Sequence, residues 1–203
     1  MKIYIDFDGT IFNNNKHYQK LINIFKKYNI QEEYINNLTN KKHYKNLDNL
    51  AKEIINNNNL NKSILKEINT IYSKDLIYKD TIPFLEKYHN QYDLILLTLG
   101  TKKYQLKKIK SLNISKYFKE IIITNKDKSL LNIDYQNSIF IDNNPIELKK
   151  FNNSKAKYLI RIKRNNDKYS KINLDINNIP EFINFNELLE SNYIKKIGEK
   201  NYE

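Results

Sequence analysis

Short apolar runs alternate along this chain with stretches in which apolar residues recur at helical spacing. A short continuous apolar run is typical of a strand that is buried on both faces of a sheet. Strands separated by helices are joined by crossovers, which makes neighbouring strands parallel and covers both faces of the sheet. The pattern therefore predicts an α/β fold whose core has three layers. The predicted strands are residues 2–7, 93–98, 120–124, 138–142 and 157–162.

The gap between the first two predicted strands is much longer than the later gaps, and its pattern is helical. Apolar residues recur there at helical spacing in three stretches, within residues 18–28, 44–55 and 60–72. Breaks are expected at Asn36-Asn37 and at residues 56–59. The sequence thus predicts a helical domain at residues 13–79, inserted into a core made of residues 1–12 and 80–203.

The remainder of the core is expected to contain three helices and one long loop. Thr81 is predicted to cap a helix that has Pro83 in its first turn and runs to residue 89. Thr101 is predicted to cap the next helix, which runs through residue 112. Residues 163–184 are polar and poorly patterned, which favours a loop, and residues 185–197 are expected to form a terminal helix.

The net charge of +12 is compatible with nucleic-acid binding, but the composition favours another cause. Lysine, asparagine, isoleucine and tyrosine are all abundant together, and asparagine adds nothing to phosphate electrostatics. An AT-rich coding bias would enrich all four residue types at once. A nucleic-acid partner is therefore not favoured, although the positive field would help to attract anionic substrates.

Several classes of site and location are excluded or disfavoured. The absence of cysteine excludes disulfides, thiolate metal sites and a cysteine nucleophile. His17, His43 and His89 lack metal-ligand spacing, so we expect them at the surface. No apolar run approaches the roughly 20 residues that span a bilayer, and Asp6 and Asp8 interrupt any signal-peptide core. A cytoplasmic protein with no membrane contact is the expectation.

Acidic and small residues stand where three predicted strands end. Asp6, Asp8 and Gly9 end the first strand, Thr98 is followed by Leu99 and Gly100, and Asp142 ends a later strand. Ligands bind at the carboxyl ends of parallel strands. Acids at such an edge are costly to bury without a partner, and a hard divalent cation with oxygen ligands is the natural one. This pattern favours a Mg²⁺ site.

These three strand ends, in this order, resemble the motifs of the haloacid dehalogenase-like superfamily of phosphotransferases. The resembling segments are Asp6-Phe7-Asp8-Gly9-Thr10, Leu96-Leu97-Thr98 and Ile139-Phe140-Ile141-Asp142. The resemblance implies a Rossmann-like core with a small helical cap, and a phosphatase that works through an aspartyl-phosphate. It argues against a dehalogenase, because those members lack the second aspartate.

The resemblance also implies a role for each motif residue. Asp6 would be the nucleophile, and Asp8 would protonate the leaving oxygen before accepting a proton from water. The hydroxyl of Thr98 and the amides of Leu99 and Gly100 would hold the phosphoryl group. Metal ligands would be the Asp6 and Asp142 carboxylates and the backbone carbonyl of Asp8.

Two motif positions are left open by the sequence. The lysine that neutralises the nucleophile and the phosphate is Lys126 or Lys128, and we prefer Lys128 because Ser129 to Leu131 look like the start of the following helix. A second acid beside Asp142 is missing. Glu147 could hold a metal-bound water or lie exposed at a helix start, and Asn143 could supply a neutral oxygen.

The expected reaction is hydrolysis of a small phosphorylated metabolite, with the cap, hinged at residues 12–17 and 80–81, choosing the substrate. Alternatives are a phosphomutase that uses the same intermediate, a nucleic-acid-binding protein or nucleic-acid-end phosphatase, and a silent scaffold. The intact set of Asp6, Asp8, Thr98 and Asp142 weighs against the scaffold. The sequence does not indicate an oligomeric state.

Overall fold

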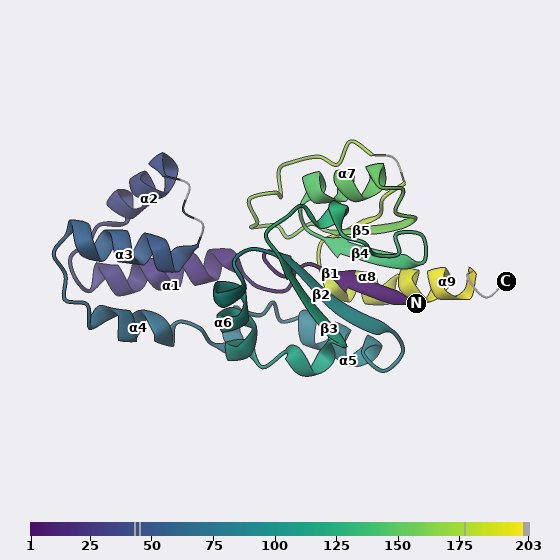
Figure 1. Cartoon of the computed structure of the whole chain (residues 1–203), viewed down its shortest axis with the longest axis horizontal. Coiled ribbons are helices and arrows are strands. Elements are labelled where there is room, and N and C mark those ends of the chain that lie inside the picture. The colour runs from purple at the N-terminus through teal and green to yellow at the C-terminus, as the bar shows by residue number, and fades with distance from the viewer. Residues whose placement is uncertain (43, 45, 177, 201–203) are drawn as a thin grey trace. The chain divides into compact units, whose positions relative to one another are not determined.

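The computed structural model describes residues 1–42, 44, 46–176 and 178–200. The chain divides into two compact units, one made of Met1–Asn13 with Ile77–Glu203 and the other of Asn14–Leu76. The first unit contains the sheet, and the described residues of the second contain helices only (Figure 1). His43, which the sequence placed at the surface, lies outside the described residues.

The first unit is built on a six-stranded sheet with the order β3-β2-β1-β4-β5-β6. All neighbouring strands are parallel, with Ile5 of β1 opposite Leu96 of β2 and Ile141 of β4. This arrangement confirms the predicted α/β fold and places β1 in the interior of the sheet. The strands are β1 (Lys2–Ile5), β2 (Asp93–Leu99), β3 (Glu120–Thr124), β4 (Ser138–Asp142), β5 (Tyr158–Ile162) and β6 (Glu181–Phe182).

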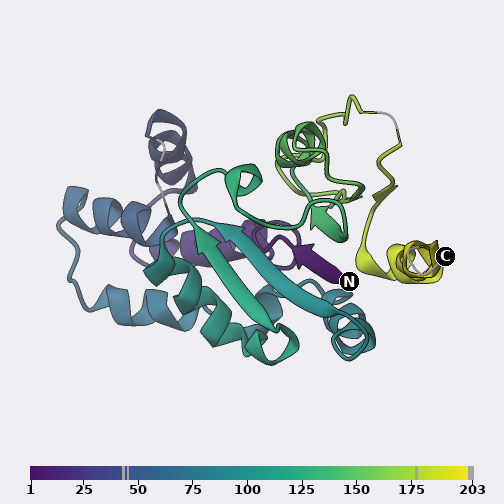
Figure 2. The ribbon, with the colours of Figure 1, turned by 45° about the vertical axis from the view of Figure 1, so that its right-hand side comes forward.

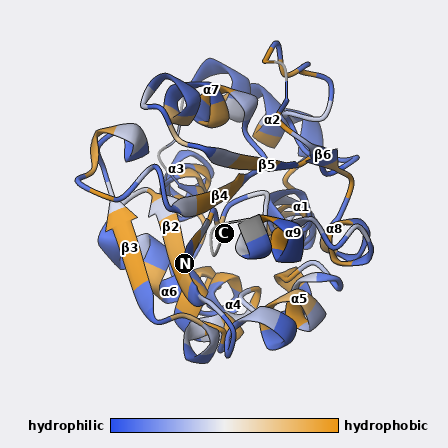
Figure 3. Cartoon of the chain, turned by 90° about the vertical axis from the view of Figure 1, so that its right-hand side faces the viewer, coloured by the Kyte–Doolittle hydropathy of each residue, from blue (hydrophilic) through white to orange (hydrophobic). Residues whose placement is uncertain are grey.

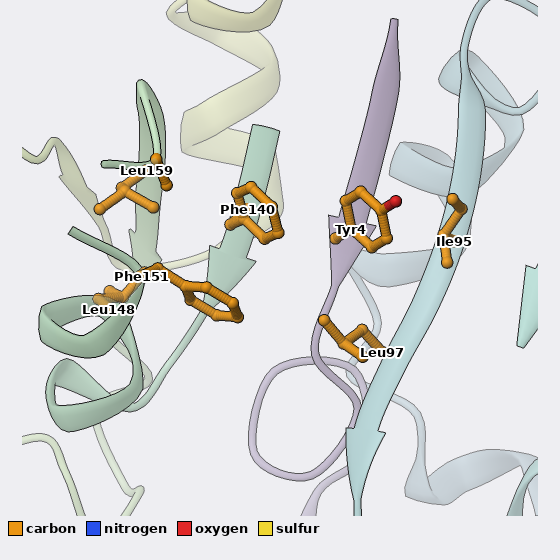
Figure 4. Packing of buried hydrophobic residues seen from close by; sticks show 8 residues of the cluster. Tyr4, Ile95, Leu97, Phe140, Leu148, Phe151 and Leu159 are labelled. Atoms are coloured by element: carbon orange, nitrogen blue, oxygen red, sulfur yellow. The ribbon is translucent and has the colours of Figure 1, made fainter. Parts of the chain in front are cut away.

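Helix α7 (Pro145–Asn153) covers one face of the sheet. Tyr4 of β1, Phe140 of β4 and Phe151 of α7 belong to one buried cluster, and Figure 4 shows their rings side by side with Ile95 and Leu97 of β2. The Tyr4 and Phe140 rings stack with centroids 5.0 Å apart. The strands themselves are strongly hydrophobic, as Figure 3 shows for β2, β3 and β4. Burial on both faces explains why these strands appear in the sequence as continuous apolar runs.

Helix α5 (Thr81–Tyr88) precedes β2 and helix α6 (Lys102–Leu112) follows it, while α8 (Phe185–Glu190) and α9 (Tyr193–Lys200) end the described chain. Alternate residues of the strands, such as Ile3 and Ile5, are fully buried on the face opposite α7. Helices α5 and α8 pack against each other through Phe84 and Phe185, whose ring centroids are 4.3 Å apart.

Several predicted boundaries in the first unit are wrong for identifiable reasons. Strand β1 ends at Ile5, and residues 163–184 contain the short strand β6. The predicted terminal helix is interrupted between α8 and α9, because Asn192 adopts a left-handed conformation with φ of 54°. Asp80 rather than Thr81 occupies the cap position of α5, and the Thr101 hydroxyl makes no capping hydrogen bond to α6.

The second unit contains four α-helices in its described residues, α1 (Asn14–Lys26), α2 (Glu32–Lys41), α3 (Leu47–Asn57) and α4 (Ile64–Thr70) (Figure 2). Helix α2 was not predicted, and the expected break at Asn36-Asn37 lies inside it. Only Ile35 of α2 is buried, so this helix has almost no apolar stripe to read. The expectation for His17 is also wrong, because it is 1% exposed, with its ring centroid 4.8 Å from that of Tyr72.

The first unit closes on itself at the point where the second is inserted. Phe12 forms an antiparallel bridge with Ile77, and the Tyr78 amide donates a hydrogen bond of 3.1 Å to the Ile11 carbonyl. The two ends of the inserted segment therefore lie beside each other. In the described part of the chain, no helix has both the length and the apolar character that a membrane crossing requires.

Candidate active site

Two carboxylates and one lysine meet where β1 and β4 end. Asp6 follows β1, and its amide donates to the Ile141 carbonyl over 2.9 Å, so the pairing of the two strands continues to this residue. The Lys128 Nζ lies 2.5 Å from Asp6 Oδ1 and 2.9 Å from Asp142 Oδ2. Because β1 and β4 are adjacent and parallel, their last residues bring the two acids to the same edge of the sheet.

This cluster is buried and carries more negative than positive charge. Asp6 is 8% exposed and Lys128 is 3% exposed. Burial and the neighbouring Asp142 carboxylate raise the pKa of Asp6 to about 7, although Lys128 opposes the shift. Burial opposes ionisation of Lys128 as well, but Asp142 and Asp6 together raise the pKa of the lysine above its usual value. One ammonium therefore serves two carboxylates, and one negative charge is left uncompensated.

A tight loop after Asp6 holds this acid in place. The Gly9 amide donates to the Phe12 carbonyl over 2.9 Å, and Gly9 has φ of 93°, a conformation that favours glycine. The buried Thr10 hydroxyl lies 3.1 Å from both Asp6 Oδ2 and Asn143 Oδ1. A Cβ on Gly9 would collide with the Asn143 side chain. Thr10 thus connects the first acid to the residue that follows β4.

Asp8 points away from the acid pair, toward helix α6. Lys108 forms an ion pair with Asp8 Oδ1, and Gln105 Nε2 donates to Asp8 Oδ2 over 2.7 Å. Neither Gln105 nor Lys108 was expected from the sequence to belong to the site. A readable signal was present, because these residues occupy the same buried face of α6 as Ile109 and Leu112, where apolar residues are usual.

Thr98 is buried at the end of β2, with its hydroxyl 3.2 Å from Gln105 Nε2. The Leu99 side chain is exposed. The Gly100 amide donates to the Thr124 carbonyl over 2.8 Å, so it serves the sheet and is not placed to bind a phosphate as the sequence suggested. Binding of a phosphate by the Thr98 hydroxyl and the Leu99 amide stays a prediction.

The two candidate lysines have different environments. Lys128 contacts both acids, whereas Lys126 is exposed two residues earlier. The helix that was expected to begin at Ser129 is not formed. Residues Lys128–Leu130 form a single 3₁₀ turn, capped by Asp127 through the Ser129 amide, and no longer helix follows.

The two polar residues expected to assist near Asp142 have other partners. Asn143 Oδ1 accepts from Thr10, and Asn143 Nδ2 donates to Asp167 Oδ2 over 2.5 Å, so its side chain is not directed at a metal. Glu147 is buried in the first turn of α7 and pairs with Lys150 at 2.8 Å.

The loop after β5 supplies further support that the sequence did not reveal. Arg164 donates to the Thr10 carbonyl over 2.8 Å and to Asp80 Oδ2 over 2.7 Å, and it is buried. Asp80 thus has a buried partner within the first unit, and the hinge expected at residues 80–81 stays a prediction. Arg161, also buried, donates to the carbonyls of Asn143 and Tyr169. No local pattern in residues 163–180 marks Arg164, because its partners Thr10 and Asp80 are far away in the sequence.

The oxygen ligands at this edge of the sheet fit a magnesium ion. In the ranges that the structure describes, no three side chains of His, Cys, Asp or Glu converge as a metal site. Asp6 and Asp142 nevertheless share one buried lysine, and the raised pKa of Asp6 reports charge that a cation would compensate. Two carboxylates and a backbone carbonyl are hard oxygen ligands of the type Mg²⁺ accepts.

Comparison with solved structures shows the same fold in distant relatives. The chain is similar to a haloacid dehalogenase-like (HAD) phosphatase from Thermococcus onnurineus, with 19% identity, coverage of 94% of this chain and 97% of that one, and a TM-score of 0.60. It is similar to YfnB from Bacillus subtilis, a protein described as a HAD hydrolase and solved with bound magnesium, with 12% identity, 94% and 97% coverage and a TM-score of 0.61. It is also similar to an L-2-haloacid dehalogenase from Xanthobacter autotrophicus, with 16% identity, 80% and 77% coverage and a TM-score of 0.57.

No curated protein sequence matches the chain. The sequence model of the haloacid dehalogenase-like hydrolases, by contrast, matches residues 3–129. That span contains the Asp6 loop, the end of β2, the inserted helices and Lys128. The match covers more than half of the chain, and the sheet order and strand-end acids agree with it. This chain belongs to the haloacid dehalogenase-like hydrolase family.

Proposed function

We propose that the protein is a magnesium-dependent phosphatase that hydrolyses a small phosphomonoester through an aspartyl-phosphate on Asp6. The observation that carries this proposal is the pair of buried carboxylates, Asp6 and Asp142, which share the single ammonium of Lys128. A buried acid pair with uncompensated charge is an expensive arrangement for a purely structural role. It suits a site that receives a cation and an anionic substrate together.

The residues divide the chemistry between them. A carboxylate oxygen of Asp6 attacks phosphorus, and the bond from phosphorus to the substrate oxygen breaks while Asp8 gives its proton to that oxygen. Asp8 then takes a proton from the water that attacks the phosphoryl group, which releases inorganic phosphate and restores Asp6. Lys128 holds Asp6 and offsets charge on the phosphoryl oxygens, and Thr98 donates to one of them.

Asp6, Asp142 and the backbone carbonyl of Asp8 would hold the magnesium ion. When bound, the ion would reduce the repulsion between the Asp6 carboxylate and the phosphate, which at 4 Å amounts to roughly 4 kcal/mol per pair of unit charges at an effective dielectric of about 20.

Solved relatives include both phosphatases and dehalogenases, so the family alone does not choose the reaction. Asp8 favours phosphoryl transfer, because a phosphate ester needs a proton donor for its leaving oxygen and a second acid supplies it. A second candidate is a phosphomutase, since the fold is also similar to a protein described as a β-phosphoglucomutase from Thermotoga maritima, with 12% identity and a TM-score of 0.68. Both reactions would use the same intermediate.

The test is release of inorganic phosphate from a panel of sugar phosphates and nucleoside monophosphates. We expect turnover with Mg²⁺ and loss of at least about 100-fold on chelation, with recovery when the metal is restored. Formation of an isomeric sugar phosphate without free phosphate would identify the mutase instead. Turnover that is indifferent to chelation would contradict the proposed mechanism.

We assign the inserted helices of Asn14–Leu76 the role of a cap that selects the substrate. Since Phe12 and Ile77 are bridged, a short glycine and serine linker can replace this segment without straining the first unit. We expect the shortened protein to retain activity within about tenfold on p-nitrophenyl phosphate and to lose its preference among metabolites. Thermal unfolding would establish that the core is folded, and complete inactivity in a folded core would contradict a purely selective role.

A further inference from the structure

Helix α6 carries a lysine on its buried face. Lys108 is only 2% exposed and shares this face with Ile109 and Leu112. An ammonium group inside a protein is costly unless it is paired, so a lysine at such a position requires a specific reason. The partner is the side chain of Asp8, the proposed acid and base.

Three aromatic rings fix the position of the Lys108 ammonium. Its Nζ lies 5.0 Å from the ring centroid of Phe7, 4.7 Å from that of Phe12 and 4.8 Å from that of Tyr104. Each ring face attracts the cation, and together the rings limit where the flexible side chain can place its charge. Two of the three rings belong to the loop that carries Asp8, so the lysine and the acid are held in one frame.

Gln105 engages the other oxygen of the same carboxylate. Its Nε2 donates to Asp8 Oδ2 over 2.7 Å, while Lys108 pairs with Oδ1. Asp8 itself is partly exposed, with 27% of its side chain accessible. A partly exposed aspartate side chain is free to rotate. Two donors from one helix, one to each carboxylate oxygen, restrict that rotation.

Gln105 also connects Asp8 with the end of β2. The same nitrogen lies 3.2 Å from the Thr98 hydroxyl and 2.9 Å from the Leu99 carbonyl. Gly100 provides the space for this arrangement, because a Cβ there would lie 2.8 Å from Gln105 Nε2. One side chain thus sets the spacing between the proposed proton donor and the proposed phosphate-binding hydroxyl.

We infer that Gln105 and Lys108 are positioning residues that orient the Asp8 carboxyl for proton transfer to the leaving group. The inference rests on the proposed phosphatase function and adds two residues of α6 to its machinery. Loss of this orientation should slow substrates with poor leaving groups more than substrates with good ones. A poor leaving group such as an alkoxide depends on a well-placed acid, whereas p-nitrophenolate departs without one.

The experiment compares kcat/KM of Lys108→Met on an alkyl phosphate, glycerol phosphate, and on p-nitrophenyl phosphate. Because kcat/KM covers only the steps up to departure of the leaving group, it isolates the donation of the proton. We expect a fall of about 10- to 100-fold on the alkyl ester and less than about threefold on the aryl ester. Methionine is apolar and flexible, so it can remain among the three rings. Asp8→Asn should give the same pattern in stronger form.

Lys110→Met is the matched control, because Lys110 is exposed on the same helix and carries the same charge. It should leave both values unchanged. If Lys108→Met does not fold, as judged by thermal unfolding, Gln105→Leu removes the second contact and should show the same selectivity. Equal losses on both esters in a folded variant, or no loss, would overturn the inference while the phosphatase proposal stands. A wild-type protein inactive on both esters would overturn both.

Discussion

Replacing Asp6 by asparagine is expected to abolish turnover and, at the same time, to stabilise the metal-free protein. The loss of activity should reach at least about 1,000-fold, because the amide cannot form the covalent intermediate. The gain in stability has a separate cause. Burial and Asp142 make the ionised form of Asp6 unfavourable in the folded state, and its pKa is raised from 3.8 to about 7.

The gain depends on pH with a definite sign. Well below pH 4 the acid is protonated in both the folded and the unfolded protein, so the substitution gains nothing. As pH rises toward 7, the unfolded chain ionises while the folded protein resists, and the wild type loses stability that the variant keeps. Above pH 7 the advantage should level off at roughly 2 to 4 kcal/mol.

Urea unfolding of both proteins in chelator, from pH 4 to pH 8, measures this difference. Asp93→Asn is the control, since Asp93 is a half-exposed aspartate paired with Lys119 and should change stability by less than about 1 kcal/mol. If the stability advantage of the variant over the wild type were no larger at pH 8 than at pH 4, the ionised form of Asp6 would not be unfavourable in the folded protein.

Replacing Lys128 by methionine should have the opposite effect on stability. Removal of the ammonium leaves two buried carboxylates facing each other, and loss of one partner from a buried ion cluster costs about 3 to 5 kcal/mol. Activity should fall by at least about 100-fold, because nothing then offsets the charge on Asp6 and the phosphoryl group. Magnesium should recover part of the lost stability by binding the same carboxylates.

Lys126 offers a matched control two residues away. Lys126→Met removes the same charge from an exposed position, and stability should change by less than about 0.5 kcal/mol. In the double variant Asp6→Asn, Lys128→Met, the stability gained from Asp6→Asn should exceed the gain it gives in the wild type, because the carboxylate that is removed no longer has an ammonium partner. Additive effects in the double variant would argue against direct coupling between the two side chains.

Strands β1, β2, β4 and β5 could be predicted from sequence because most of their residues are buried on both faces of the sheet. Strand β4 was predicted with both ends correct, and β3 likewise. Helix α2 could not be predicted because its single buried residue, Ile35, leaves no periodic apolar stripe. A sequence pattern reveals a helix through its buried apolar residues, and α2 has too few of these to be recognised.

The residues of the candidate site were likewise predictable from the sequence only in part. Asp6, Thr98 and Asp142 could be named because parallel strands bring their carboxyl ends to one edge. Gln105 and Lys108 lie 97 and 100 residues from Asp8 in the sequence, so only the three-dimensional structure shows that they contact it. The catalytic and metal-binding roles of all these residues stay predictions until the variants are measured.

The interior position of β1 has a consequence for the order in which the chain folds. Strand β1 is made first, yet its two neighbours are β2, which begins at Asp93, and β4, which begins at Ser138. The helices of Asn14–Leu76, by contrast, find their partners within their own segment. During synthesis the helical insert can therefore fold early, while the oldest strand waits longest for its neighbours. The loop that follows this strand, residues 6–12, takes shape only after β4 has been made.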